Sequence, residues 1–266
     1  MKRRDFLKSS AAAAGAAALA PLLPAGAAEV SGSVSREFYE LRLYHFRQGP
    51  MARRFDDYCR NAAIPATNRA GAGPVGVFSV MLGPDTPAMY VLIAHKSLDS
   101  FVTLSERLRD DAEYQKAGAE FINASPSDLP YIRVESSFMA AFSGMPRLEV
   151  PGLTAGNKPR LFELRIYESH SKKAGKKKIE MFNTGEIAIF RRTGLTPVFF
   201  GETLVGARMP NLTYMLVFAD AAEREKSWGA FRADAEWASL RSKPEYADIV
   251  SNISNVLLRP APYSQI

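Results

Sequence analysis

The chain has 266 residues, a formal net charge of +6, 47% hydrophobic residues and 23% charged residues. This composition is that of a folded globular protein, and it excludes a disordered, collagen-like or disulfide-rich chain. Residues 1–27 carry half of the net charge, and the rest of the chain has 30 basic and 27 acidic residues. A net charge of +3 gives no reason to expect nucleic acid or an anionic membrane as a partner.

The N-terminal residues 1–27 have the three parts of an export signal. A basic start precedes an alanine-rich stretch at 11–20 and the small-residue string AGA at 25–27. The string RRDFLK at 3–8 resembles the twin-arginine signal, with an ordinary secretory signal as the alternative. The apolar stretch is shorter than the roughly 20 residues that span a membrane. We therefore predict a periplasmic or secreted protein whose mature chain has no transmembrane segment.

The remainder of the chain contains an internal repeat. Three pairs of strings match at nearly constant spacing, which predicts a duplication. The pairs are FYELRLY at 38–44 with LFELRIY at 161–167 (123 residues apart), MYVLI at 89–93 with TYMLV at 213–217 (124 apart), and RDDAEY at 109–114 with RADAEW at 232–237 (123 apart).

Each repeat has the same predicted order of elements, strand-helix-strand-strand-helix-strand, which is the ferredoxin-like arrangement. The elements are expected at 38–46, 51–70, 75–82, 88–95, 97–118 and 131–142, and again at 161–168, 173–193, 197–205, 212–219, 222–242 and 249–259. We place the first repeat at 36–142, a linker rich in glycine and proline at 143–160, and the second repeat at 161–260.

A four-stranded sheet with helices on one face leaves its other face to be covered. We therefore predict an α+β fold in which two tandem ferredoxin-like repeats pack sheet to sheet as an intrachain α/β barrel. Side-chain alternation divides the first strand of each repeat into two sets. The apolar sets are Tyr39, Leu41, Leu43 and Phe162, Leu164, Ile166; the polar sets are Glu40, Arg42, Tyr44 and Glu163, Arg165, Tyr167. We expect the apolar sets to face the helices and the polar sets to face the other sheet or solvent.

The two polar sets have a functional and a structural interpretation. They would line an inter-sheet cavity, with arginine holding an anionic ligand, glutamate as base and tyrosine as proton donor. Alternatively, they neutralise each other inside the barrel, and their occurrence in both repeats favours this interpretation. The candidate ligand-binding residues are Glu40, Arg42, Tyr44, Glu163, Arg165, Tyr167 and His95.

The positions of the histidines, the cysteine and the lysine-rich run in the sequence predict their roles. His45 and His95 fall at strand ends, where a barrel mouth would lie, and no histidine has the spacing of a metal site. Cys59 is the chain's one cysteine and is expected on the apolar face of a helix, buried and inert. The lysine-rich run 172–178 is expected to be a solvated loop rather than an anion or lipid-headgroup patch.

The tryptophans of the second repeat are expected to serve packing. Trp228, Phe231 and Trp237 are assigned to the core or to contacts between the repeats rather than to a sugar-binding platform. The sequence contains neither a P-loop nor a G-x-S-x-G motif, and nucleotide use has no support.

The E-L-R-[LI]-Y strand of both repeats and the [DA]-x-E-[YW] end of the second helix resemble the NIPSNAP family over about residues 36–260. This family is similar to the dimeric α/β-barrel superfamily, and the resemblance implies the fold more strongly than a function. The superfamily includes cofactor-free and haem-using oxygenases, haem peroxidases and isomerase-like enzymes, but transferring a chemistry on fold alone would be analogy.

Three functions follow as hypotheses. We prefer a protein that binds a small molecule in the inter-sheet cavity, because the sequence shows a duplicated polar set and no catalytic constellation. The alternative is an oxygenase- or isomerase-type enzyme in the same cavity, cofactor-free or haem-using, and the second alternative is a protein-interaction module. The sequence identifies neither a cofactor nor an oligomeric state, and a homo-oligomer stays open.

Overall fold

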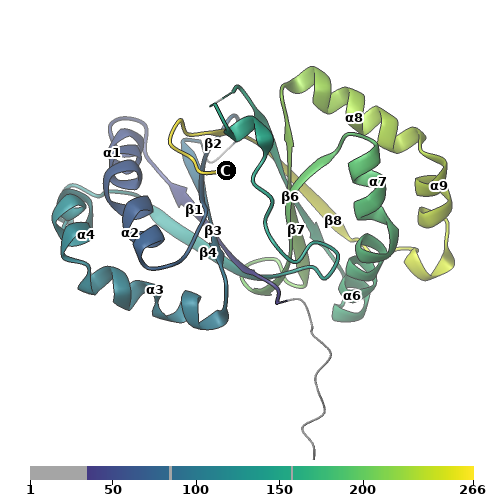
Figure 1. The fold of residues 1–266 in the computed structure, drawn as a ribbon, viewed down its shortest axis with the longest axis horizontal. Helices are drawn as coiled ribbons and strands as arrows, with labels where there is room; N and C mark the ends of the chain where they lie inside the picture. Colours follow the sequence, from purple (N-terminus) through teal and green to yellow (C-terminus); the bar gives the residue numbers. More distant parts are fainter. Residues whose placement is uncertain (1–34, 84–85, 157) are drawn as a thin grey trace, which may run out of the picture. The chain divides into compact units, whose positions relative to one another are not determined.

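The computed structural model describes residues 35–83, 86–156 and 158–266, and the predicted export signal at 1–27 lies outside them. Within the described residues, eight strands form one closed antiparallel barrel (Figure 1). They are β1 (Phe38–His45), β2 (Val75–Val80), β3 (Ala88–His95), β4 (Arg133–Ala141), β5 (Leu161–Glu168), β6 (Thr196–Val205), β7 (Asn211–Phe218) and β8 (Asn252–Pro260).

The helices follow the same order in each half of the chain. The first half has α1 (Met51–Tyr58), the π-helical turn η1 (Cys59–Ala63), α2 (Ile64–Arg69), α3 (Leu98–Asp110), α4 (Ala112–Ala117) and α5 (Ala119–Ile122). After the 3-10 turn η2 (Gly152–Thr154), the second half has α6 (Lys172–Met181), the π-helical turn η3 (Phe182–Glu186), α7 (Ile187–Arg192), α8 (Ala221–Ala233), α9 (Ala235–Arg241) and the 3-10 turn η4 (Pro244–Tyr246). The predicted βαββαβ order is therefore confirmed in both halves.

The strand order explains how two open sheets become one barrel. Each repeat has its strands in the ferredoxin-like spatial order, β4-β1-β3-β2 in the first and β8-β5-β7-β6 in the second. The sheets join at both edges, where β2 pairs with β8 and β4 pairs with β6. Closure leaves neither sheet with an unpaired edge, and the predicted α+β tandem barrel is confirmed.

Pairing registers correct one of the three string matches. Arg42 lies opposite Val91 in the first repeat, and Arg165 lies opposite Tyr214 in the second. Val91 is therefore the counterpart of Tyr214, where counterparts are residues 123 apart that occupy the same place in the two repeats. The match of Tyr90 with Tyr214 was wrong by one residue, and such a slip places the two side chains on opposite faces of their sheets.

The prediction of which strand face lies inside the barrel was wrong. Buried apolar side chains of both sheets form one cluster in the barrel: Tyr39, Leu41, Phe78, Leu92, Met139, Phe162, Leu164, Met215, Leu258 and Ile266 among them. The polar sets face the helices instead. An eight-stranded barrel has room for side chains and little else, so charged groups inside would lose hydration without gaining partners. A cavity of about 80 Å³ remains at one barrel end, lined in part by Tyr90, Glu135 and Arg208.

Helices cover the outer faces of the strands (Figure 1). The expected single helices at 97–118 and 222–242 are each broken at an aspartate, Asp111 and Asp234. Each aspartate caps the following helix and forms an ion pair with an arginine, Arg69 at 2.9 Å and Arg192 at 2.6 Å. The RDDAEY and RADAEW strings are thus explained by a repeated helix cap.

The structure bears on four further predictions, which concern Cys59, the tryptophans, the lysine run and membrane-spanning helices. Cys59 is buried, as predicted. Trp228 and Phe231 belong to the core between helices and sheet, and Trp237 packs against it, which confirms their packing role. The lysine run is not a solvated loop, because it forms the first part of α6, and Lys178 is buried. No helix of the described residues is both long and apolar enough to cross a membrane.

Candidate functional site

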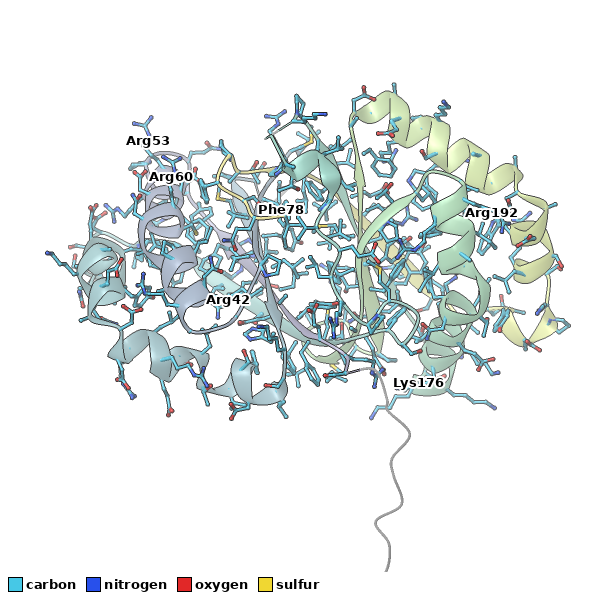
Figure 2. The ribbon with its side chains drawn as sticks, in the orientation of Figure 1. Arg42, Arg53, Arg60, Phe78, Lys176 and Arg192 are labelled. Carbon is cyan, nitrogen blue, oxygen red and sulfur yellow. The ribbon has the colours of Figure 1, made fainter. Side chains whose placement is uncertain are left out.

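The polar residues of β1 lie between the sheet and the helices of the first repeat, and Figure 2 shows Arg42 on that side of the strands. Glu40 is buried and accepts hydrogen bonds from Arg42 Nε at 2.7 Å, Arg42 Nη2 at 2.8 Å and Ser136 Oγ at 3.0 Å. The Arg42 side chain keeps 29% of its surface exposed. The expected neutralisation of glutamate by arginine occurs, but outside the barrel.

His95 lies beside this pair rather than at a barrel mouth. Its ring is fully buried, with Nδ1 3.2 Å from Ser100 Oγ and Nε2 3.9 Å from Glu40 Oε2, and Nε2 has no hydrogen-bond partner among the described residues. Burial lowers the pKa of His95 and outweighs the attraction of Glu40, so the imidazole is neutral at pH 7. His45, by contrast, ends β1 with its Nε2 2.8 Å from Glu135 Oε1.

The polar set of the second repeat belongs to a closed network. The fully buried Glu163 accepts hydrogen bonds from Arg165 Nη1 at 2.8 Å, from Arg224 Nε and Nη2 at 2.9 and 3.0 Å, and from Trp228 Nε1 at 2.8 Å. Burial alone would raise the pKa of Glu163, but these donors and charges hold it below its ordinary value of 4.5. Arg165 lies 4.5 Å from the Trp228 ring and donates from Nη2 to Tyr167 Oη at 3.2 Å.

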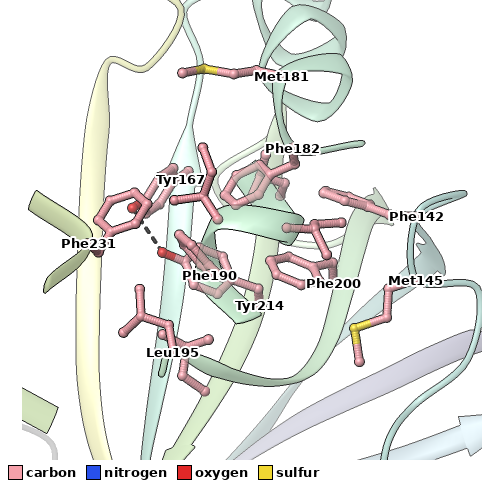
Figure 3. Close-up of a cluster of buried hydrophobic side chains, with 14 of the residues drawn as sticks. Phe142, Met145, Tyr167, Met181, Phe182, Phe190, Leu195, Phe200, Tyr214 and Phe231 are labelled. Atoms are coloured by element: carbon pink, nitrogen blue, oxygen red, sulfur yellow. Dashed lines mark hydrogen bonds between the residues drawn. The ribbon is translucent and has the colours of Figure 1, made fainter. Parts of the chain in front are cut away.

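The space between sheet and helices differs between the repeats. In the first repeat it holds a cavity of about 60 Å³, lined by Arg42, Tyr44, Phe55, Tyr58, Cys59, Ala63, Ile64, Thr67, Val75, Val91, Ile93, Leu108 and Tyr114. In the second repeat aromatic rings occupy this layer (Figure 3). Tyr214 is fully buried there, and its hydroxyl donates to Tyr167 Oη at 2.9 Å, the contact dashed in Figure 3.

Side-chain size accounts for this difference. Six of the residues that line the cavity are smaller than their counterparts: Cys59 against Phe182, Ala63 against Glu186, Thr67 against Phe190, Val91 against Tyr214, Leu108 against Phe231 and Tyr114 against Trp237. The two repeats have the same backbone conformation at this point, a π-helical turn at residues 59–63 and 182–186. The cavity therefore arises from the residues that line it and not from a different fold.

The lining of the cavity is apolar apart from neutral hydroxyls and one paired cation. Burial raises the pKa of Tyr44, an effect that Arg42 only partly offsets, and burial is also the main cause of the raised pKa of Tyr58. Both phenols are therefore protonated at neutral pH. A guanidinium has five N–H donors, and Glu40 accepts from two of those of Arg42. The site suits a mostly apolar molecule that carries a hydrogen-bonding oxygen.

The same residues do not have the geometry of a metal or haem site. Among the described residues no group of three or more histidine, cysteine, aspartate or glutamate side chains is arranged to hold a metal ion. His95 does not fit the role of a haem ligand. Its ring is fully buried, meets the Phe101 ring edge-on at 5.6 Å, and has Glu40 3.9 Å from its free nitrogen.

Of the residues that line the cavity, the sequence identified Arg42 and Tyr44 as candidates for ligand binding, and it missed the other eleven because they lie outside the polar sets of the strands. A usable signal was present. Aligning the repeats at the constant spacing of 123 would have shown smaller residues in the first repeat at positions 59, 63, 67 and 91.

Comparison with protein families gives two matches. A sequence model described as NIPSNAP matches residues 39–131 and 162–265. A second, described as a twin-arginine translocation pathway signal sequence, matches residues 1–20. A search of curated proteins gives no significant match.

Solved structures with similar folds cover most of the chain. A "putative monooxygenase" from Fusobacterium nucleatum has a TM-score of 0.54 and 10% identity, over 85% of this chain and 93% of that one. A "putative monooxygenase" from Lactobacillus acidophilus has a TM-score of 0.55 and 8% identity, over 87% and 98%. An "anthrone oxidase-like protein" has a TM-score of 0.52 and 9% identity, over 86% and 93%. At these identities the likeness shows the barrel fold alone.

Proposed function

The chain belongs to the NIPSNAP family, and from that premise we propose that the sheet–helix cavity of its first repeat binds a small molecule. The observation that carries this proposal is the contrast between the repeats. One framework is built twice; among the described residues, the first copy has a cavity beside the Glu40–Arg42 pair, whereas aromatic rings occupy the corresponding layer of the second copy. In the second copy, aromatic rings and the Glu163 network fill the corresponding layer, and we assign this copy the structural role of stabilising the barrel. The binding site thus moves from the inter-sheet space to the outer face of the first sheet.

An oxygenase-type enzyme is the second candidate at the same site. It is supported by the barrel likeness to two proteins titled putative monooxygenase and to one titled anthrone oxidase-like. An enclosed apolar cavity also keeps water from a reactive intermediate. Turnover of a bound phenol or anthrone in the presence of oxygen, lost on filling the cavity, would favour the enzyme over a binding protein.

Filling the cavity is expected to abolish binding. Val91→Tyr introduces the residue that the second repeat has at the counterpart position, so the added ring occupies the space beside Arg42. We expect at least about a tenfold loss of affinity for phenols and quinones identified by native mass spectrometry, a factor that corresponds to about 1.4 kcal/mol. Thermal unfolding of the free protein checks that the variant folds.

The matched control is Tyr214→Val in the second repeat. It removes a fully buried ring and is expected to lower stability by about 3–5 kcal/mol, while affinity for the same compounds stays unchanged. Equal affinity in wild type and Val91→Tyr would refute the cavity as the binding site. Equal loss in both variants would mean that affinity follows overall stability.

The twin-arginine signal implies that the protein is exported, and we propose the periplasm or the exterior as its destination. Replacing Arg3 and Arg4 by lysine keeps the charge that an ordinary secretory signal requires. We expect the precursor to accumulate in the cytoplasm, as measured by cell fractionation. Unchanged export of the double variant would instead assign the ordinary secretory route.

A further inference from the structure

A surface groove lies on the outer side of one wall of the binding cavity. The groove has a volume of about 370 Å³ and is formed by α1, the π-helical turn η1, α4 and α5. It is lined by Pro50, Arg53, Arg54, Asp57, Tyr58, Asn61, Ala117, Gly118, Glu120 and Phe121. Tyr58 lines both this groove and the inner cavity of about 60 Å³. Its side chain is therefore the partition between the two spaces.

A hydrogen bond and ring packing hold Tyr58 in place, and the Phe55 and Tyr114 rings lie 6.3 and 6.2 Å from its ring. Its hydroxyl is 2.7 Å from the hydroxyl of Tyr114, and its ring is stacked on the Phe121 ring, with centroids 4.0 Å apart and planes 11° apart. Tyr58 ends α1 and stands directly before η1. The hydrogen bond joins neutral groups and is weak, and the ring contacts of Tyr58 are all with the helices α1, α4 and α5, so displacing this side chain breaks no strand pairing of the barrel.

The second repeat has no such partition. The counterpart of Tyr58 is Met181, which is buried in the aromatic core, and the counterpart of Tyr114 is Trp237. The hydroxyl pair therefore occurs in the repeat that has a cavity behind it. If Tyr58 and Tyr114 served only to pack the helices, side chains without a hydroxyl would suffice, as Met181 and Trp237 do in the second repeat.

We infer that Tyr58 is a gate, and that the outer groove is a second subsite of the ligand site proposed above, on which this inference rests. The inner cavity is too small for more than the oxygen-bearing end of a ligand. The groove presents charged and polar groups of both signs, with Arg54 paired to Asp128 at 2.7 Å and Arg53 pointing away from the sheet (Figure 2). The ligand class is thus an elongated molecule with an apolar, hydroxyl- or carbonyl-bearing end inside and a longer part in the groove.

Cys59 makes the gate measurable without a ligand. It lines the inner cavity and is the only cysteine of the sequence, so its reaction with 4,4′-dithiodipyridine reports access to that cavity. Tyr58→Phe, which removes only the hydroxyl contact, is expected to raise the rate about fivefold, the factor for losing one neutral hydrogen bond. Tyr58→Ala, which removes the partition, should raise it by more than about tenfold.

Controls separate gating from unfolding. Met181→Ala loosens the second repeat at the counterpart position and should leave the rate unchanged, as should low urea concentrations if the opening is local. The gate is overturned if the Tyr58 variants react no faster than the wild type, or if Met181→Ala accelerates the reaction equally.

Ligand binding then tests the second subsite separately. Asn61→Trp places a ring in the groove and should weaken 4-phenylphenol about tenfold or more while leaving phenol unaffected, a difference of at least about 1.4 kcal/mol. If neither compound protects Cys59, the proposed function fails while the gate result stands. If phenol and 4-phenylphenol each bind Asn61→Trp as tightly as they bind the wild type, the outer subsite is refuted and the inner binding site is unaffected.

Discussion

Replacing Glu163 by glutamine is expected to lower the free energy of unfolding by about 3–5 kcal/mol, the range for breaking a buried ionic network by removing one partner. Glu163 is fully buried and accepts from three side chains, so an amide would turn its own NH₂ group toward Arg165, Arg224 or Trp228. Both arginines would then lose their shared negative partner. Urea unfolding at pH 7, followed by tryptophan fluorescence, measures the loss.

Glu40→Gln is the matched control in the first repeat. Glu40 accepts from one arginine, and that arginine keeps 29% of its side-chain surface exposed. Water can therefore compensate Arg42 in part, and we expect a clearly smaller loss of stability. Equal losses in the two variants would contradict the assignment of Glu163 as the central group of a closed network.

The effect of Glu163 should depend on pH in a defined direction. Its folded pKa is below the ordinary value of 4.5, so its stabilising contribution is complete above pH 4.5 and is lost as the pH falls through the folded pKa. The difference in unfolding free energy between wild type and Glu163→Gln should therefore narrow below pH 4.5. Urea midpoints at several pH values test this, and a difference that widens on acidification would refute it.

The repeat and the topology were predictable because local sequence patterns determine both. Strand alternation, glycine-bounded turns and the spacing of 123 residues fixed the element order of both halves. Which face of each strand lies inside the barrel was not predictable in the same way. Alternation separates Leu41 from Arg42 but does not say which of them meets the other sheet. Both faces are buried here, one by strands and one by helices, so polarity alone could not decide.

The candidate site could be predicted only in part. Glu40, Arg42 and Tyr44 were identified from their recurrence, yet the cavity beside them depends on how the two repeats differ. The one-residue error in matching Tyr90 to Tyr214 concealed the smaller Val91, because it exchanged a barrel-facing residue for a helix-facing one. The similarity of the repeats reveals the duplication, and the differences between them locate the cavity.

The lysine run shows how a charge pattern can mislead. Residues 172–178 suggest a solvated segment by composition, but Ser171 accepts a hydrogen bond from Ala174 N and starts a helix there. That helix turns Lys178 inward, where its Nζ is 2.6 Å from Glu186 Oε2, on the far side of the π-helical turn η3. The partner is eight residues away, a separation that the regular α-helical spacing of three or four does not reveal.

Removing this lysine should be as damaging as disrupting the Glu163 network. Lys178→Met keeps the length of the side chain but leaves Glu186 buried without its hydrogen-bonded cation, and we expect a loss of about 3–5 kcal/mol in urea unfolding at pH 7. Burial already raises the pKa of Glu186, and Lys178 is the group that chiefly opposes the rise. Because a raised folded pKa makes an acid bind its proton more tightly when folded, the variant should regain stability toward pH 4.5 and lose it as the pH rises.

The decisive comparison is the double variant Lys178→Met with Glu186→Met. Replacing both members of a buried pair by apolar side chains is often neutral, and the counterparts Phe55 and Ala63 show that this framework accepts an apolar pair. We therefore expect the double variant to recover to within about 1 kcal/mol of wild type. Lys177→Met, which breaks an exposed pair with Glu180 at 2.9 Å, should have no measurable effect. If the double variant were as unstable as the single one, the loss would come from packing around Lys178 and not from an unpaired buried charge.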